Sequence, residues 1–149
     1  MVTSSPMANL LQLAGIALDA TASSREEAVA LCGAKLVELG AVSPEYADAM
    51  WEREKIFPSE MGEGFAIPHG TDESRKYVNF DQLVFIRLKE EITWVNEPVT
   101  VCVGIASAGD GHVEILGNLA DVLMDDDAAN ILRTSQDPQA ILDLILKGV

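Results

Sequence analysis

An apolar run beyond the middle of the chain, Val99–Ile105, leaves few folds open to this sequence. It reads Val-Thr-Val-Cys-Val-Gly-Ile and is almost continuous in apolar and β-branched residues. A strand with one face in solvent alternates apolar and polar residues, whereas a strand covered on both faces does not. The run therefore predicts a central strand, with a layer of helices on each side of its sheet.

Helical and strand patterns alternate along the rest of the chain. Leu83–Leu88 is the other strong strand candidate, and Ile16–Leu18 is a shorter one. Helical segments are predicted to begin near Ser24, Ser43, His112, Ala128 and Asp137, where apolar residues recur mostly at spacings of three and four. The alternation predicts one α/β domain in which helices cover the sheet.

Several helix boundaries carry local signals. Ser24 followed by Glu27 matches a capping box, in which each side chain accepts a hydrogen bond from the other residue's backbone N–H. Ser43-Pro44 and Asp137-Pro138 each combine an N-cap residue with proline at the first helical position. Gly40 supplies a C-terminal stop. These signals predict helices that start after Ser24, Ser43 and Asp137.

Composition excludes several classes of function. The chain has 149 residues, of which 24 are acidic and 10 basic, so its formal net charge is −14. This charge disfavours direct nucleic-acid binding, which depends on a basic patch that neutralises phosphates. It suits a basic protein partner, and it equally suits a surface that is acidic only for solubility. No apolar run approaches the roughly 20 residues that span a bilayer, which argues against direct membrane insertion.

The cysteines and histidines are too few and too scattered for a metal centre. Cys32 and Cys102 lie inside apolar segments without CxxC or CxxH spacing, so we expect small buried side chains in a reducing compartment. The chain contains only two histidines, and neither has the nearby cysteine or carboxylate spacing of a zinc site. The N-terminus also lacks the basic and apolar regions of a signal peptide.

The stretch Met61–Thr71 presents the most unusual local chemistry. It reads Met-Gly-Glu-Gly-Phe-Ala-Ile-Pro-His-Gly-Thr. Its glycines can adopt positive φ or allow close approach of another group. Its proline fixes its own φ and holds the preceding residue extended. We therefore expect His69 to leave the end of a short strand on a rigid turn, either as a chemical reagent or as an ordinary exposed loop residue.

His112 is a candidate for the same site. It follows the predicted strand Val99–Ile105 and begins a helix. Because sites in open α/β sheets gather at the carboxyl ends of strands, His69 and His112 are expected to face one crevice. A helix N-terminus at His112 would offer N–H groups to an anion and would keep the imidazole neutral. The alternative is that His112 is a plain helix cap.

Arg53 is the third candidate. It lies on one helix face with Tyr46 and Met50, which precede it at helical spacing, and so ends a mostly apolar stripe. Its guanidinium would supply a fixed positive charge matched to phosphate geometry. The alternative is a surface ion pair with Glu54 or another neighbour.

An imidazole nucleophile with N–H donors and one guanidinium suits phosphoryl transfer through a histidine. In such transfers the charge lies on the equatorial oxygens, so catalysis is mainly positioning and electrostatics. The sequence contains no Walker loop, no kinase glycine loop and no acidic metal cluster. A nucleotide-dependent kinase is therefore disfavoured.

With these residues, the chain resembles the enzyme IIA component of the bacterial phosphoenolpyruvate-dependent sugar phosphotransferase system (PTS), in its mannitol/fructose class. The resemblance rests on three correctly ordered segments: Tyr46-x-x-x-Met50-x-x-Arg53-Glu54, Gly62-x-Gly64-x-Ala66-Ile67-Pro68-His69-Gly70-Thr71 and His112-x-x-Ile115-Leu116-x-x-Leu119. The run from Thr71 to Val78 is more similar to the mannitol branch than to the nitrogen-regulatory branch.

The resemblance implies a phosphocarrier. By it, His69 accepts a phosphoryl group on Nε2 from the phosphohistidine of HPr and passes it to a cysteine of the cognate IIB component. The sugar, mannitol-like or fructose-like, then enters through the membrane component IIC, while His112 and Arg53 stabilise the phosphoryl group. No metal or organic cofactor is implied. The implied fold is α/β, with a mixed, mostly parallel five-stranded sheet and helices on both faces.

Two other functions remain open on the sequence alone. The first is a regulatory, nitrogen-type IIA protein, in which phosphorylation of His69 is a signal that feeds no transporter. The second is a small-molecule-binding α/β module with an incidental Pro-His-Gly turn. Sugar specificity, oligomeric state and the choice between a separate protein and a domain of a fused transporter are also left open.

The expected organisation is one PTS IIA domain in the cytoplasm. We expect residues 1–7 to be a disordered or non-native N-terminal extension, and residues 8–149 to form the domain.

Overall fold

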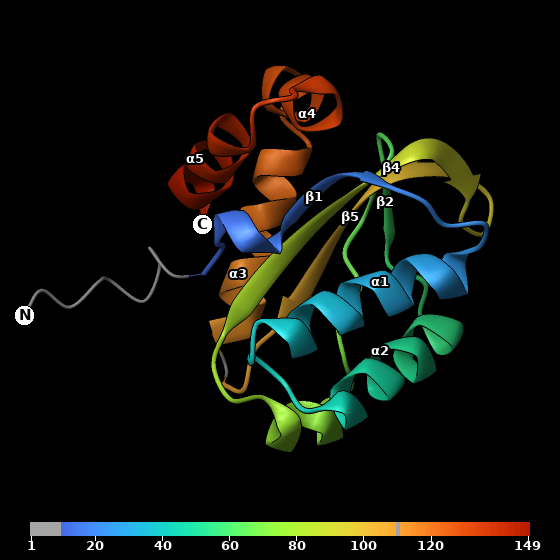
Figure 1. Ribbon diagram of the computed structural model, residues 1–149, viewed down its shortest axis with the longest axis vertical. Helices are drawn as coiled ribbons and strands as arrows, with labels where there is room; N and C mark the ends of the chain where they lie inside the picture. Colours follow the sequence, from blue (N-terminus) through green and yellow to red (C-terminus); the bar gives the residue numbers. More distant parts are fainter. Residues whose placement is uncertain (1–9, 110) are drawn as a thin grey trace, which may run out of the picture.

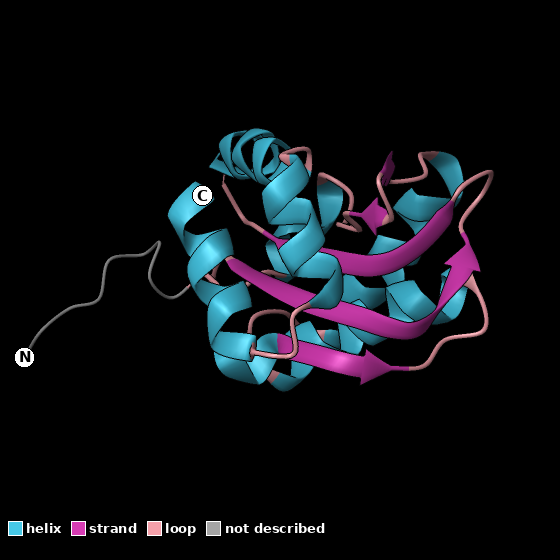
Figure 2. Cartoon of the chain, turned by 90° about the horizontal axis from the view of Figure 1, so that it is seen from above, coloured by secondary structure: helices cyan, strands magenta, loops and turns pink. Residues whose placement is uncertain are grey.

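The computed structural model describes residues 10–109 and 111–149, except for the side chains of residues 111–113. The predicted extension, residues 1–7, lies outside these described residues. A five-stranded sheet with helices on both faces forms the described chain, as predicted (Figures 1 and 2).

The sheet is built around the apolar run. Its strands are β1 (Ile16–Ala20), β2 (Glu60–Gly62), β3 (Phe65–Ala66), β4 (Gln82–Thr93) and β5 (Pro98–Ala106), in the spatial order β1-β4-β5-β3-β2. The middle strand, β5, contains the predicted central segment.

The direction of the strands corrects one expectation. Strands β1 and β4 pair in parallel, as do β3 and β5, whereas β4 pairs antiparallel with β5 and β2 with β3. The sheet is therefore mixed, as expected, but it is not mostly parallel. The reason is that β4 and β5, and likewise β2 and β3, are consecutive strands joined by turns too short for a parallel crossover.

The helices form two layers. Helices α1 (Arg25–Glu38) and α2 (Pro44–Ile56) cover one face, and α3 (Gly111–Leu123), α4 (Asp126–Thr134) and α5 (Pro138–Gly148) cover the other (Figure 1). Two 3-10 turns, η2 (Leu13–Gly15) and η3 (Glu73–Tyr77), complete the described elements. The second turn begins four residues after His69.

Strand alternation explains the two layers. On β4, Val84 and Ile86 pack in the core beneath α1 and α2, while Leu83 and Phe85 pack beneath α3 and α5. All four side chains are buried, so both faces are covered, as the apolar runs predicted. In β5, a Cβ added at Gly104 would lie 2.8 Å from the Cβ of Cys32, which shows how closely α1 packs on this strand.

The helix signals are largely confirmed. The Ser24 side chain accepts a hydrogen bond from the Glu27 N–H at 3.2 Å, and the Asp137 side chain accepts one from Gln139. The reciprocal half of the capping box differs, because the Glu27 carboxylate accepts from the N–H and hydroxyl of Ser23 instead of the N–H of Ser24. Gly40 ends α1 with a φ of +78°.

The cysteines are buried and free, as predicted. A hydrogen bond with Cys32 and burial raise the pKa of the Cys102 thiol well above its usual value, so this thiol stays protonated. Within the described residues, no helix combines the length and the apolarity that a membrane crossing requires.

Candidate functional site

His69 leaves the sheet beside the end of the central strand. The carbonyl of Pro68 accepts a hydrogen bond from the N–H of Ile105 at 2.9 Å, and His69 forms an isolated parallel bridge to the same residue. The short strand β3 precedes this bridge by two residues. The prediction of a histidine on a turn at a strand end is therefore confirmed, and the turn is fastened to β5.

A backbone carbonyl sets the tautomer of His69. The ring Nδ1 lies 2.8 Å from the carbonyl oxygen of Ile67. Because a carbonyl can only accept, Nδ1 must carry the hydrogen in this contact, and the neutral ring then keeps its lone pair on Nε2. The His69 side chain is half-buried, and the backbone fixes one of its two ring nitrogens.

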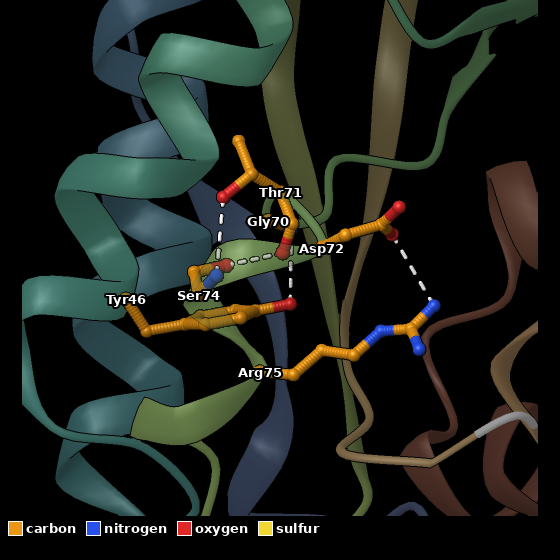
Figure 3. A network of polar contacts seen from close by, with 6 residues as sticks. All are labelled: Tyr46, Gly70, Thr71, Asp72, Ser74 and Arg75. Atoms are coloured by element: carbon orange, nitrogen blue, oxygen red, sulfur yellow. Dashed lines mark hydrogen bonds and ion pairs between the residues drawn. The ribbon is translucent and has the colours of Figure 1, made fainter.

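Tyr46 fixes the residue that follows the histidine. Its hydroxyl accepts a hydrogen bond from the Gly70 N–H at 2.9 Å (Figure 3). It also donates one to the Ile105 carbonyl at 2.8 Å. Burial raises the pKa of Tyr46, although the hydrogen bond from Gly70 and the charges of Arg75 and Arg53 act in the opposite direction. The hydroxyl therefore stays protonated and links α2, the turn and β5.

The close contact of Tyr46 explains why residue 70 is glycine. An added Cβ at Gly70 would lie 2.6 Å from the tyrosine ring and 2.5 Å from the hydroxyl oxygen of Ser74. Ser74 in turn donates its hydroxyl to the Thr71 carbonyl at 2.6 Å and its N–H to the Thr71 hydroxyl at 3.2 Å (Figure 3). The turn after His69 is thus packed against the Tyr46 ring and held by the hydrogen bonds that Ser74 donates to Thr71.

A small cavity of about 70 Å³ opens beside the histidine. Polar and charged side chains from α2, from the turn after His69 and from the end of β5 dominate its lining. The lining residues are Tyr46, Arg53, His69, Gly70, Thr71, Asp72, Arg75, Ile105, Ser107 and Leu116. We refer to this cavity as the His69 crevice. It brings two guanidinium groups to one imidazole.

Arg53 lies where the sequence placed it, in the last turn of α2, and lines the crevice. Its guanidinium stacks on the Phe57 ring, with the central carbon 5.4 Å from the ring centroid, and Nη1 lies 3.4 Å from the Phe57 carbonyl oxygen. The described residues include no ion pair for Arg53, so the alternative of a helix-surface pair with Glu54 is wrong.

Glu54 instead points into the protein. It is 2% exposed, and its carboxylate accepts hydrogen bonds from the N–H and hydroxyl of Ser59, each at 2.6 Å, and from Trp94 Nε1 at 2.9 Å. Three donors satisfy this buried carboxylate, which ties the end of α2 to the segment before β2 and to the β4–β5 turn.

His112 is only partly located. Its backbone lies in the first turn of α3, after β5, as predicted. Its side chain lies outside the described residues, so its place at the crevice remains a prediction. Among the described residues, no group of three or more histidine, cysteine or acidic side chains could hold a metal ion.

Three crevice residues were not predicted from the sequence as part of the site. Tyr46 was assigned only to an apolar stripe, although its spacing of seven from Arg53 places both on one face. Arg75 carried no signal that separates it from the adjacent Lys76. Ser107 directly follows β5, and its position at a strand end was a usable signal; its Oγ is buried without a hydrogen-bond partner among the described residues.

The fold and the crevice define a class of small mixed α/β proteins that present one tautomer-fixed histidine beside cationic side chains. Comparison with known proteins identifies the family. The profile of the family described as "Phosphoenolpyruvate-dependent sugar phosphotransferase system, EIIA 2" matches residues 9–148. The chain therefore belongs to the EIIA 2 family of that system.

Individual relatives agree with this assignment. The chain is 33% identical to the mannitol-specific phosphotransferase enzyme IIA component of Halalkalibacterium halodurans, over 89% of this chain and 92% of that protein. It is 34% identical to the PTS mannitol-specific EIICBA component of Vibrio cholerae over 91% of this chain, but it spans only 21% of that longer protein.

A solved structure shows the same fold. It is the complex of enzyme IIA-mannitol with phosphorylated enzyme IIB-mannitol from Escherichia coli. One chain of that structure superimposes with a TM-score of 0.85 and 31% identity, covering 93% of this chain and 99% of that one. The mannitol-type fold predicted for this chain is thus confirmed.

Proposed function

We propose that this chain is a phosphocarrier that takes a phosphoryl group onto Nε2 of His69 from phosphorylated HPr and passes it to a cysteine of a IIB component. The observation that carries the proposal is the 2.8 Å contact between His69 Nδ1 and the Ile67 carbonyl, which leaves the lone pair on Nε2. The crevice with Arg53 lies next to that nucleophile.

This phosphoryl transfer requires no proton acceptor, because every bond formed is matched by one that breaks. The lone pair of His69 Nε2 forms a new P–N bond, while the P–N bond in the donor histidine breaks and its electron pair returns to the donor ring. The hydrogen stays on Nδ1, where it is donated to the Ile67 carbonyl, so the phosphorylated ring becomes an imidazolium. Its positive charge and that of Arg53 oppose the negative charge on the phosphoryl oxygens.

The same geometry serves the second transfer. The thiolate of the IIB cysteine attacks phosphorus, the P–Nε2 bond breaks, and the electron pair returns to His69. Because the Nδ1 contact never changes, the histidine is restored in the tautomer that accepts the next phosphoryl group. His112, at the start of α3, is proposed as a further group that stabilises the phosphoryl oxygens.

The mannitol-specific relatives support a role in sugar uptake, with a mannitol-like polyol as the first candidate substrate of the system. They do not favour the regulatory, nitrogen-type alternative. We further propose that residues 8–149 form a IIA domain that acts in the cytoplasm and feeds the membrane component IIC through IIB.

The test is phosphorylation in a reconstituted system. We expect the protein to take up one acid-labile, base-stable phosphoryl group from radiolabelled phosphoenolpyruvate in the presence of enzyme I and HPr, and to lose it on addition of a mannitol-type IIB. His69→Ala should take up none. Label on His69→Ala, or no label on the wild-type chain, contradicts the proposal.

A further inference from the structure

A second guanidinium lines the His69 crevice. Arg75 lies in the turn η3, six residues after His69, and contributes to the same small cavity as Arg53. Its side chain is 30% exposed, so it is largely covered. The two arginines reach the crevice from different elements, the end of α2 and the turn that follows the histidine.

Both arginines lie near the tyrosine that holds the histidine turn. Tyr46 lines the same cavity as Arg53 and Arg75, and their charges oppose the rise that burial causes in its pKa. The Tyr46 hydroxyl is 2.9 Å from the backbone nitrogen of Gly70, the residue directly after His69. The cavity, which Gly70 also lines, therefore brings both guanidinium groups to the residue that follows His69.

Arg75 is held by a partner that can release it. Its Nη2 lies 3.2 Å from Oδ1 of Asp72, whose side chain is 90% exposed (Figure 3). An ion pair with one partner in solvent is screened and therefore weak. Asp72 also lines the crevice, so Arg75 can exchange partners with little movement of the backbone.

We propose that Arg75 is a second phosphoryl-binding residue, which leaves Asp72 for the phosphoryl oxygens when His69 carries the group. This inference rests on the proposed function and deepens it. The phosphoryl group offers up to two negative charges and three acceptor oxygens in a half-enclosed space, whereas Asp72 offers one charge in solvent. A guanidinium can also bind two of those oxygens at once.

The exchange gives Asp72 a role as well. When His69 is unphosphorylated, the Asp72 carboxylate holds Arg75 in place and partly neutralises two neighbouring cations. In the phosphorylated crevice the same carboxylate repels the phosphoryl group and competes for Arg75. The phosphorylated state is therefore stabilised by Arg75 and opposed by Asp72, which keeps the group transferable to the next acceptor.

The adjacent Lys76 provides a matched control. It belongs to the same turn and carries the same charge, but its Nζ lies 5.3 Å from the centroid of the Tyr77 ring. It lines a different depression, with Ala49 and Glu52. Removing its charge reproduces the change in net charge without touching the His69 crevice.

The equilibrium constant for phosphoryl exchange between phosphorylated HPr and this chain tests the proposal. That constant depends only on the end states, so it is insensitive to how the two proteins dock. We expect Arg75→Gln to shift it against this chain by about tenfold or more, because a charge-assisted hydrogen bond is lost. Arg75→Lys should lie between Arg75→Gln and the wild type, Asp72→Asn should shift the constant in favour of this chain, and Lys76→Gln should stay within about twofold.

The outcomes separate the two proposals. If the wild type is labelled but Arg75→Gln behaves like Lys76→Gln, Arg75 belongs only to a surface pair and the inference is wrong, whereas the phosphocarrier function stands. If the wild type takes up no label, both fail. Should Arg75→Gln not fold, Asp72→Asn decides: a shift in favour of this chain supports the exchange, and no shift overturns it.

Discussion

Two glycine-containing turns lie in the stretch Met61–Thr71, and they differ in what their glycines do. The glycine turn, residues 62–64, joins β2 to β3, and the histidine turn, residues 67–70, leaves β3 for the crevice. Both are fastened to β5, because Gly64 accepts from Val101 at 3.0 Å and Pro68 accepts from Ile105 at 2.9 Å. They are therefore fixed at successive positions along one strand.

The glycine turn depends on backbone conformation. Gly62, Glu63 and Gly64 have φ values of +90°, +57° and +88°, a left-handed run that few side chains tolerate. Arg133 from α4 donates to the Glu63 carbonyl at 2.8 Å, and neither residue lines the His69 crevice. Glycine is favoured in this turn because it can adopt a positive φ without strain.

The histidine turn depends on space. Gly70 has no positive φ, but the Tyr46 ring occupies the place of a Cβ. Glycine here lets the tyrosine hydroxyl reach the backbone beside His69. Glycine is thus required for backbone conformation in the glycine turn and for close packing in the histidine turn. The two requirements have different consequences for function.

The largest effect is expected for Gly70→Ala. The added Cβ would meet the Tyr46 ring at 2.6 Å, so the turn or the tyrosine must move and His69 moves with it. Overpacking of this kind costs about 2–3 kcal/mol in the free energy of unfolding. We expect phosphorylation of the folded fraction to slow by about 100-fold, since small misplacements have such effects.

Urea denaturation and initial rates of label uptake measure these two quantities. Gly117→Ala is the control, because an added Cβ there meets nothing within 4 Å. If Gly70→Ala matched Gly117→Ala in rate, the contact with Tyr46 would not position the nucleophile.

A smaller effect is expected for Tyr46→Phe. The ring still fills its place, but the Gly70 N–H and the Ile105 carbonyl lose their buried partner. Unsatisfied groups of this kind cost about 1–3 kcal/mol. We expect that loss of stability with a roughly tenfold slower phosphoryl transfer, measured by denaturation and label uptake. A normal transfer rate would show that the ring alone holds the turn.

The same variant should change the alkaline limit of stability. Burial raises the folded pKa of Tyr46 above the ordinary value of 10.0. Below that value the hydroxyl is protonated in both states, so its contribution is constant; above it the unfolded state loses the proton first, and stability falls until the folded pKa is passed. The free energy of unfolding should therefore fall less above about pH 10 in Tyr46→Phe than in the wild type. Equal slopes would contradict this.

The smallest functional effect is expected for Gly64→Ala, which tests the other turn. Its φ of +88° is unfavourable for alanine, and the added Cβ would lie 3.1 Å from the Thr100 hydroxyl. We expect a loss of about 1–2 kcal/mol in the free energy of unfolding, and an unchanged phosphorylation rate per folded molecule. A slowed rate would show that the two turns are mechanically coupled.

Much of the fold follows from local signals. The continuous apolar run predicted a strand covered on both faces, and β5 is such a strand. N-cap residues with proline placed the starts of α2 and α5, because the physics of a helix end involves only neighbouring residues. The Pro-His-Gly turn likewise predicted a histidine at a strand end.

These local signals do not predict contacts between residues that are far apart in the chain. Arg53 was predicted as a site residue and Glu54 only as its alternative surface partner, yet Arg53 lines the crevice and Glu54 is buried on Ser59 and Trp94. Which of them turns inward depends on where α2 packs. Arg75 and Lys76 differ for the same reason, since only the position of η3 decides which one meets the cavity.

The amino-acid sequence by itself determined the helix and strand patterns, the rigid turn at His69 and, through motif spacing, the family. Those properties depend on backbone preferences and on periodic burial, which neighbouring residues carry. Tertiary structure alone decided the parallel pairing of β1 with β4, the tyrosine contact that requires Gly70, and the second arginine of the crevice. Each of these depends on distances between residues far apart in the chain, and such distances exist only once the sheet and its helix layers have packed.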